Sequence, residues 1–492
     1  METTPIPLEP RPKQNLRLNC LSYPEVLAQS VSVLAPSTVP AAILGLIFVS
    51  AGSGTWLSFL LAMVGVLFVS VNINQFARRS ASSGSLYTYI VKGLGPTIGV
   101  LSGWALLLGY TLTGMSTLCG FGIFGQMLLG EIGIHVPIIA LYVVGVVASY
   151  IIAHKDIQLS AKMMLVFEAV SLVAILALGI IVWTTKGFAL DWNQLNLKGA
   201  TPSGVLTGIV LVVFGFSGFE SSTALGEEAK DPLRTIPRSL IQSTVICGLF
   251  FIFVAYIIIL AFENTGLDLG STEAPLDVVS KRAGVGYLGV LINIGALLSF
   301  FSCTLACINS TARIVFSMAR HGLFHDALGE AHEVNETPHI AVGLSAILTF
   351  LVPAILVWLG VKAFDAQGYL GTLCSLGFIV VYILVSVAAP VYLRNMGKLR
   401  SLDVVYSALG VGFMILPLLG TIGIPGSKLF PPPAYPNSLL NWLFAGYMVV
   451  GLIWLLIQRT RTPKLNHSIK SSIDEIHLKF GDIKHAAISK PE

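Results

Sequence analysis

The sequence predicts an all-α polytopic membrane protein with about 12 transmembrane helices, of which the first and the sixth are discontinuous. Of the 492 residues, 54% are hydrophobic and only 11% are charged, whereas a soluble domain carries about 25% charged residues. The mean hydropathy of +0.82 agrees with this assignment. Helix-breaking residues interrupt the first and the sixth apolar segments. Breaks at these two positions suggest two structural repeats, each beginning with a discontinuous helix.

The apolar segments set the expected domain organisation. A bilayer-spanning helix needs roughly 20 apolar residues, and such segments lie near 24–50, 55–77, 96–128, 136–153, 157–183, 203–228, 239–262, 285–315, 338–360, 366–392, 402–423 and 438–458. We expect a tail at 1–22, a ten-helix core at 23–400 with repeats at about 23–185 and 202–400, two further helices in 401–458, and a tail at 459–492.

The basic residues predict the orientation in the membrane. With the N-terminus in the cytoplasm, 23 of the 29 Lys and Arg residues fall on the cytoplasmic side or in the tails, and 6 fall outside. This is a strong positive-inside bias. We therefore expect both termini in the cytoplasm, and a polar C-terminal tail that is poorly ordered. Residues 1–19 lack the apolar region of a cleaved signal peptide, so the first span is expected to act as a signal anchor in the cell membrane.

The first break is rich in proline. It reads Ala35-Pro36-Ser37-Thr38-Val39-Pro40. Each proline lacks an N–H and disrupts the hydrogen bond to the preceding turn, but proline is tolerated where a new helix begins. A half-helix that starts at Pro40 presents free N–H groups and the positive end of its dipole.

The sixth span is broken at Gly215-Phe216-Ser217-Gly218. Glycine permits unwinding and close approach of the backbone, which leaves carbonyls free. Unwound backbone at membrane depth is tolerated where it is buried or lines a cavity. The two breaks together predict donors for an anion and acceptors for an ammonium group at a transporter's binding site. The alternative is a pair of simple kinks, because proline and glycine are common in membrane helices.

Two carboxylates are predicted near the middle of the membrane, Glu168 in the fifth span and Glu220 in the sixth. A carboxylate at this depth is costly and usually marks an ion, proton or substrate pathway. Because burial favours the neutral form, either residue is a candidate proton carrier. The alternatives are that Glu220 caps the helix restarting after Gly218, and that Glu168 makes a structural bond to a neighbouring serine or backbone group.

Other polar and aromatic residues are candidate cavity walls. Ser299 and Ser302 belong to a stripe of small residues on the eighth span, which suits either close helix packing or a cavity wall. Tyr110 and Phe216 are candidate aromatic walls, with packing in the core or against lipid as the alternative.

Several chemistries are not indicated. No HExxH motif and no GxxxxGK[ST] loop occurs, and we expect no catalytic residue, metal or cofactor. A polytopic membrane enzyme is therefore a remote alternative. The net charge of +4 needs no nucleic-acid partner, because the cytoplasmic loops account for it.

Residues around the breaks resemble the amino acid–polyamine–organocation permeases. The stretch from Phe214 to Glu220, with Gly226-Glu227-Glu228-Ala229-Lys230-Asp231-Pro232 and Thr235-Ile236-Pro237-Arg238, resembles the family's sixth helix and following loop. Ser83-Gly84-Ser85-Leu86-Tyr87 and Gly103-Trp104 resemble the segment joining the second and third helices. Asn309-Ser310-Thr311-Ala312-Arg313, Ala319-Arg320-His321-Gly322 and Thr337-Pro338-His339 resemble the eighth helix and the next loop. The similarity covers roughly residues 22–400.

The resemblance implies a LeuT-like fold of two inverted five-helix repeats that works by alternating access. It implies secondary transport of an amino acid across the cytoplasmic membrane, with lipid as the surroundings and protons as the expected coupling ion. The substrate carboxylate would meet residues Ala35, Ser37, Thr38 and Val39, and the ammonium would meet carbonyls there and at Phe214, Gly215, Phe216, Ser217 and Gly218. Phe216 would cover the substrate.

The first break departs from the family's Gly-rich pattern. Pro36 cannot donate a hydrogen bond, although the hydroxyls of Ser37 and Thr38 can. An importer of polyamines or small amines is therefore the alternative, with Glu168 or Glu220 pairing with the substrate cation.

Overall fold

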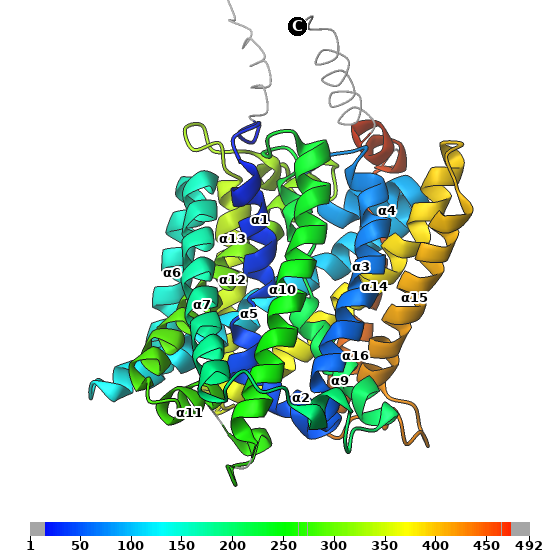
Figure 1. The fold of residues 1–492 in the computed structure, drawn as a ribbon. Coiled ribbons are helices and arrows are strands. Elements are labelled where there is room, and N and C mark those ends of the chain that lie inside the picture. Colours follow the sequence, from blue (N-terminus) through cyan, green and yellow to red (C-terminus); the bar gives the residue numbers. More distant parts are fainter. Residues whose placement is uncertain (1–14, 264, 273, 464, 474–492) are drawn as a thin grey trace, which may run out of the picture.

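The computed structural model describes residues 15–263, 265–272, 274–463 and 465–473. They form a bundle of long helices, with one isolated bridge between Leu21 and Ala229 as the single piece of β-structure in these ranges. Both ends of the described chain lie at the same end of the bundle, at the top of Figure 1. We call this end the terminal face and the other end the opposite face.

The predicted spans correspond to observed helices. In the described chain, 11 stretches are long and apolar enough to cross a membrane. The first, Tyr23–Ala77, is 55 residues long and reverses direction at Gly52–Gly54, so it contains both the first and the second predicted spans (Figure 1). Each of the 10 other stretches matches one of the remaining predicted spans.

The first half begins with a helix in two pieces. Helix α1 (Tyr23–Leu34) and helix α2 (Leu44–Ala51) are separated by an irregular segment and a π-helical turn, η1 (Val39–Ile43). The half continues with α3 (Thr55–Ala77), α4 (Ser85–Leu94), α5 (Pro96–Glu131), α6 (Ile138–Lys155) and α7 (Ile157–Thr185). Asp156 caps α7 by accepting a hydrogen bond from the Gln158 N–H at 2.9 Å.

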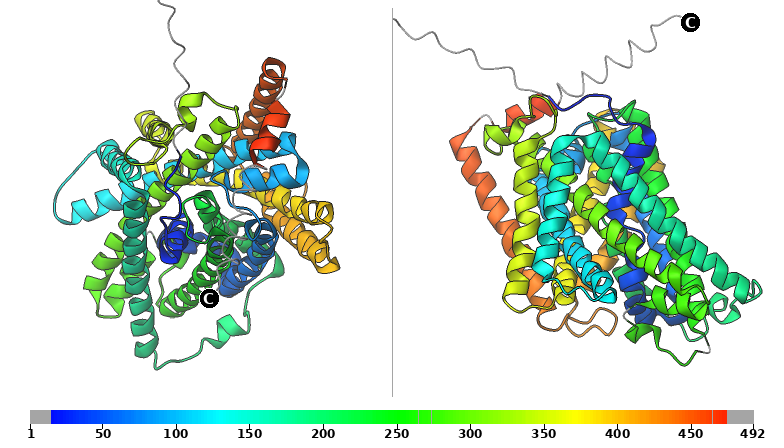
Figure 2. Two further views of the ribbon diagram at one scale, coloured as in Figure 1. Left: turned by 90° about the horizontal axis from the view of Figure 1, so that it is seen from above. Right: turned by 90° about the vertical axis from the view of Figure 1, so that its left-hand side faces the viewer.

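The second half repeats this order. Helix α9 (Pro202–Phe216) and the 3₁₀-helix η3 (Ser221–Leu225) are the two pieces of the sixth span. They are followed by α10 (Pro232–Phe262), α11 (Pro275–Arg282), α12 (Gly286–Arg320), α13 (His339–Trp358) and α14 (Ala363–Asn395). Two further helices, α15 (Ser401–Ile422) and α16 (Asn437–Arg461), pack at the side of this core (Figures 1 and 2).

Two short helices occupy corresponding places in the two halves. Helix α4 joins the second and third spans at the terminal face, and α11 joins the seventh and eighth spans at the opposite face (Figure 1). This placement is what two repeats of opposite orientation require. Neither helix was predicted, because each is too short to cross a membrane.

The centre of the bundle is formed by α5, α12 and α14, whose faces are largely buried. Small residues allow these helices to approach closely. A Cβ atom at Gly377 of α14 would lie 2.7 Å from the Ala105 carbonyl oxygen of α5, which is closer than van der Waals contact permits. The rigid centre therefore depends on glycine at this crossing.

The C-terminal tail differs from the expectation. Helix α16 extends to Arg461, and residues 465–473 form a further helix at the terminal face. Leu465, Ile469 and Ile473 recur at every fourth position and are buried, so this helix packs through an apolar stripe. The prediction of a poorly ordered tail is wrong for this segment; residues 474–492 and 1–14 lie outside the described residues.

Candidate functional site

The first helix is broken where the prolines predict. Helix α1 ends at Leu34, and Ala35 has left-handed backbone with φ of 42°. The Thr38 N–H and hydroxyl both donate to the Ala35 carbonyl, at 2.9 and 2.8 Å. The Thr38 hydroxyl, predicted as a donor to substrate, is thus engaged within the break. Ser37 is completely buried, and its hydroxyl has no hydrogen-bond partner among the described residues.

The sixth helix is broken after Phe216. Gly218 has φ of +85°, a conformation that favours glycine, and its N–H donates to the Tyr382 hydroxyl at 2.8 Å. The Ser217 hydroxyl donates to the Val213 carbonyl at 3.2 Å. The predicted discontinuity of both helices is confirmed.

The two breaks face each other. A Cβ atom on Gly215 would lie 2.8 Å from Cγ2 of Val39, and one on Gly218 would lie 2.2 Å from Cγ1 of Val33. On the side toward the terminal face, the Ser221 hydroxyl donates to the Gln29 carbonyl at 3.0 Å. Glycines at 215 and 218 therefore permit direct contact between the two broken helices.

Glu220 connects the sixth break to two other helices. Its carboxylate is completely buried and accepts hydrogen bonds from the hydroxyl of Tyr110 in α5, at 2.8 Å, and from the hydroxyl of Tyr382 in α14. Its side chain does not cap η3, so the capping alternative is wrong. The Tyr110 ring also packs against the Phe378 ring in a T-shaped arrangement, with ring centroids 5.1 Å apart. The hydroxyls of both tyrosines therefore donate to the same carboxylate, that of Glu220.

Glu168 lies in a different place, between α7 and α12. It is 2% exposed, and both of its oxygens accept from the Ser299 hydroxyl, at 3.0 and 3.1 Å. Ser302, one turn further, donates to the Ser32 hydroxyl of α1 at 2.9 Å. Beside it, the Cys303 thiol donates to the Val33 carbonyl at 3.4 Å. Glu168 is thus joined through α12 to the end of α1 that precedes the first break, and it is not brought together with Glu220.

A cavity of about 350 Å³ lies toward the opposite face, and we call this cavity the vestibule. Its walls come from η1, α2, α5, α9, α14, α15 and α16, and none of the described residues that line it carries an ionisable side chain. Phe214 lines it, and a Cβ on Gly371 of α14 would meet the Phe214 ring at 2.9 Å. Phe216 instead packs against Phe251 of α10, with ring centroids 5.4 Å apart.

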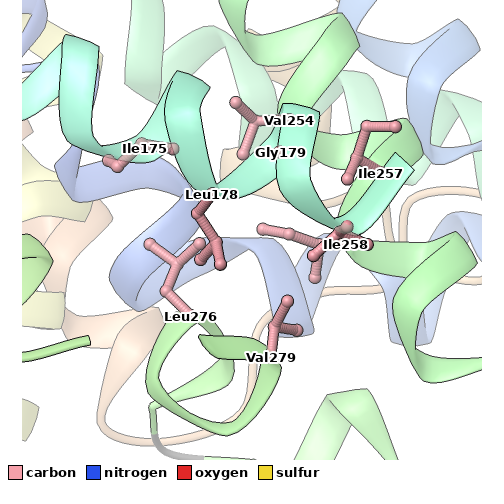
Figure 3. A pocket seen from close by; sticks show the side chains of 9 residues that line it. Ile175, Leu178, Gly179, Val254, Ile257, Ile258, Leu276 and Val279 are labelled. Carbon is pink, nitrogen blue, oxygen red and sulfur yellow. The ribbon is translucent and has the colours of Figure 1, made fainter. Parts of the chain in front are cut away.

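A small apolar space elsewhere in the bundle is too small to be a binding site. It lies between α7, α10 and α11, has a volume of about 10 Å³ and is lined by Ile175, Leu178, Val254 and other apolar residues (Figure 3). A site for one water needs roughly 10–15 Å³ and polar partners. We regard this space as a packing defect.

The bundle is closed between the breaks and the terminal face. Arg313 of α12 and Glu228 form a bidentate ion pair with N–O distances of 2.5 and 2.8 Å, and their side chains are 1% and 0% exposed. The Glu228 carbonyl accepts from the N–H groups of Cys20 and Leu21, and the Lys230 N–H donates to the Leu21 carbonyl at 2.8 Å. The chain before α1 is thereby fixed to the segment after η3.

Sequence reasoning missed three of these residues. Tyr382 and Phe378 lie in a long apolar span, where nothing in one sequence separates them from core aromatics. Arg313 was part of a recognised motif, but its partner Glu228 is 85 residues away. The apolar vestibule became visible only once the helices were assembled.

Comparison with known proteins agrees with this architecture. The sequence model of the amino acid permease family matches residues 34–457. A branched-chain amino acid permease of Bacillus subtilis, BcaP, is 26% identical over 436 residues, covering 83% of this chain and 85% of that protein. The low-affinity putrescine importer PlaP of Escherichia coli is 25% identical, covering 81% and 83%. A methylthioribose transporter of B. subtilis is 23% identical, covering 71% and 76%. These relatives are transporters rather than enzymes.

Among solved structures, the manganese transporter of Eremococcus coleocola has a similar fold. One crystal structure of a single-residue variant superposes with a TM-score of 0.55 at 15% identity, covering 91% of this chain and 98% of that one. A second variant of the same transporter gives 0.54 at 16% identity, covering 89% and 95%. At this identity the similarity concerns the fold alone, and it confirms the predicted LeuT-like arrangement of an integral membrane protein.

Proposed function

The chain belongs to the amino acid permease family, and from this premise we propose that it is a secondary transporter that carries a neutral, apolar amino acid across the cytoplasmic membrane. The observation that carries this proposal is the vestibule. In the described chain its lining contains no ionisable residue, and apolar residues such as Ile43, Leu211 and Phe214 dominate it. A zwitterion with an apolar side chain suits such a path better than a polyamine. The zwitterion's ammonium is accompanied by its own carboxylate, whereas a polyamine's cations have no such partner, and an unpaired cation is costly to desolvate.

Alternating access is supported by the asymmetry of the two faces. The vestibule lies on the side of the breaks toward the opposite face, where Ile43 and Phe214 next to the breaks line it, while the buried pair of Glu228 and Arg313 closes the terminal face. We assign the terminal face to the cytoplasm, in agreement with the positive-inside bias. The vestibule is then the entry for external substrate.

We place the substrate site between the two breaks. The backbone groups predicted to bind the substrate are unchanged, but the roles of three side chains differ from the prediction. Ser37 supplies a buried hydroxyl that lacks a partner in the described chain and is suited to donate to a carboxylate. Phe214, rather than Phe216, is the aromatic cover, because it lines the vestibule next to Gly371. Tyr110 acts indirectly, by fixing Glu220.

We assign proton coupling to Glu168. It is buried without a cation among the described residues in contact with it, and its contacts run through Ser299 on α12 to Ser302 and α1. Loss or gain of a proton there changes the interaction that connects α7 and α12 beside the first break. Glu220 is held by two tyrosine hydroxyls and serves to position the sixth break.

Uptake into proteoliposomes tests the proposal. Wild-type protein is expected to accumulate labelled L-leucine under an inward proton gradient and to leave putrescine outside. Ser37→Ala removes a hydrogen bond to a charged group, worth about 1.5–3 kcal/mol, so leucine uptake at low concentration should fall ~10-fold or more. Ser149→Ala is the matched control, because the Ser149 hydroxyl in α6 is also buried and has no partner in the described chain.

The alternative of an amine importer predicts the reverse selectivity. Accumulation of putrescine without leucine, or equal uptake by Ser37→Ala and wild type, would refute the assignment of a carboxylate-bearing substrate to this site.

A further inference from the structure

A second cavity opens at the opposite face, outside the vestibule. Its volume is about 320 Å³. The walls come from the end of α2, the short helix α8 (Trp192–Leu195), the end of α10, and the loop leading to the 3₁₀-helix η4 (Leu269–Ser271). We call it the side pocket. Unlike the vestibule, it is lined by Asp191, Lys198, Glu263 and Asp268.

The side pocket contains acceptor atoms that the described part of the fold does not use. Both oxygens of Asp191 already have partners within the protein. One accepts from the N–H groups of Asn193 and Gln194, and the other accepts from the Gln194 side-chain amide at 2.7 Å. Gln194 is 1% exposed, and its Oε1 atom has no partner among the described residues. Glu263 and Asp268 each use one oxygen, for Asn193 at 2.9 Å and for the N–H of Gly270 at 3.0 Å. One oxygen of each remains available to a ligand.

The lining also supplies a cation and an apolar wall. Lys198 is exposed and belongs to none of the ion pairs between described residues. Phe48, Phe262 and Leu269 are apolar members of the lining. Carboxylate oxygens, an ammonium and an apolar surface in one pocket match the three parts of an amino acid zwitterion with an apolar side chain.

We propose that the side pocket is a second binding site for a free, apolar amino acid on the external face. This inference rests on the proposed function for the identity of the ligand. The ligand's ammonium binds Glu263, Asp268 and the side-chain Oε1 atom of Gln194. Its carboxylate binds Lys198, and its side chain packs on the apolar wall.

The site is connected to the transport path through α2. On one side, Ala42 and Ile43 of η1 and Leu46 of α2 line the vestibule, and on the other Phe48 of α2 lines the side pocket. Helix α2 packs directly on η4, since a Cβ on Gly45 would lie 2.8 Å from the Leu269 carbonyl oxygen. An occupant of the side pocket therefore contacts the elements that hold the vestibule wall.

A fluorescent label at the pocket rim tests binding at this place. Leu267 lines the pocket and is 48% exposed, and all six native cysteines are buried, so Leu267→Cys can be labelled selectively. L-Leucine is expected to shift the emission of this protein. Isoamylamine and 4-methylpentanoate, which each lack one charge of leucine, should bind at least ~10-fold more weakly. Ile132→Cys, 69% exposed at the end of α5, is the control and should not respond.

Charge variants distinguish this site from the transport site. In the labelled Leu267→Cys protein, Lys198→Gln, or Glu263→Gln with Asp268→Asn, should weaken the response to leucine ~10-fold or more. Ser37→Pro should abolish uptake and leave the response intact. Leucine uptake by wild type without any emission shift, or a shift unchanged by both charge variants, overturns the side-pocket site. A charge-dependent shift without leucine uptake supports the pocket and refutes the proposed function instead.

Discussion

Removal of one partner of the buried ion pair should be the most damaging single substitution at the terminal face. In Arg313→Met the carboxylate of Glu228 remains 0% exposed without its two charge-assisted hydrogen bonds. Breaking such a pair on one side typically costs about 3–5 kcal/mol. Replacing both residues with methionine removes both buried charges, so the double variant should recover most of this loss.

The measurement is a double-mutant cycle of unfolding free energies in mixed micelles with increasing SDS. We expect an interaction energy of at least ~2 kcal/mol between the two substitutions. The control is Lys281→Met, because the Lys281–Asp277 pair has an N–O distance of 2.7 Å but a lysine that is 68% exposed, and such pairs contribute about 0–1 kcal/mol. If Arg313→Met costs no more than Lys281→Met, water reaches the pair and the terminal face is not closed as described.

Three further outcomes are expected. Gly226→Ala places a Cβ 2.6 Å from the backbone nitrogen of Ser82, so uptake should fall at least ~10-fold. The control is Gly446→Ala, where a Cβ meets nothing within 4 Å and uptake should be unchanged. Equal uptake by the two variants contradicts a tight contact at Gly226. Glu168→Gln cannot titrate and should exchange leucine across liposomes without accumulating it under a proton gradient; accumulation with wild-type pH dependence would make Glu168 structural. Burial, and secondarily Arg320, lowers the pKa of His321 from 6.5 to about 4. Stability from its neutral form is therefore complete above pH 6.5 and lost as the pH falls toward 4, by about 3 kcal/mol, and His321→Gln should unfold with a weaker acid dependence; an unchanged dependence contradicts this origin.

Local sequence signals determined the parts of the fold that were predicted correctly. Span limits follow from runs of apolar residues, and the two breaks follow from proline and glycine, which act on their own backbone. The tail helix carried an equally local signal, since Leu465, Ile469 and Ile473 recur every four residues. It was missed because the surrounding composition is polar.

Rotation of a helix about its axis is not a local property. Phe214 and Phe216 are two residues apart, so their side chains point in nearly opposite directions on a helix. Which one lines the vestibule depends on how α9 packs against α10 and α14. The same holds for Glu220, whose tyrosine partners come from α5 and α14, 110 and 162 residues away. Sequence alone predicted that both carboxylates lie near the middle of the membrane but could not give their partners.

The kind of interaction at the terminal face also fits the transport cycle proposed above. The contacts that α1 and η3 make there are mostly between neutral groups, such as the Gln29 amide with the Ala306 carbonyl at 2.8 Å. Glu228, in the segment after η3, and Arg313 of α12 instead form a buried pair of opposite charges. In a closed interior its attraction is strong, but the cost of desolvating both charges offsets much of that gain. When the face opens, water solvates both side chains and recovers that cost. An ion pair at this place therefore fixes the closed register specifically while adding little to the free energy needed to open it, whereas an apolar contact of similar size would lose its stabilisation in full on exposure to water.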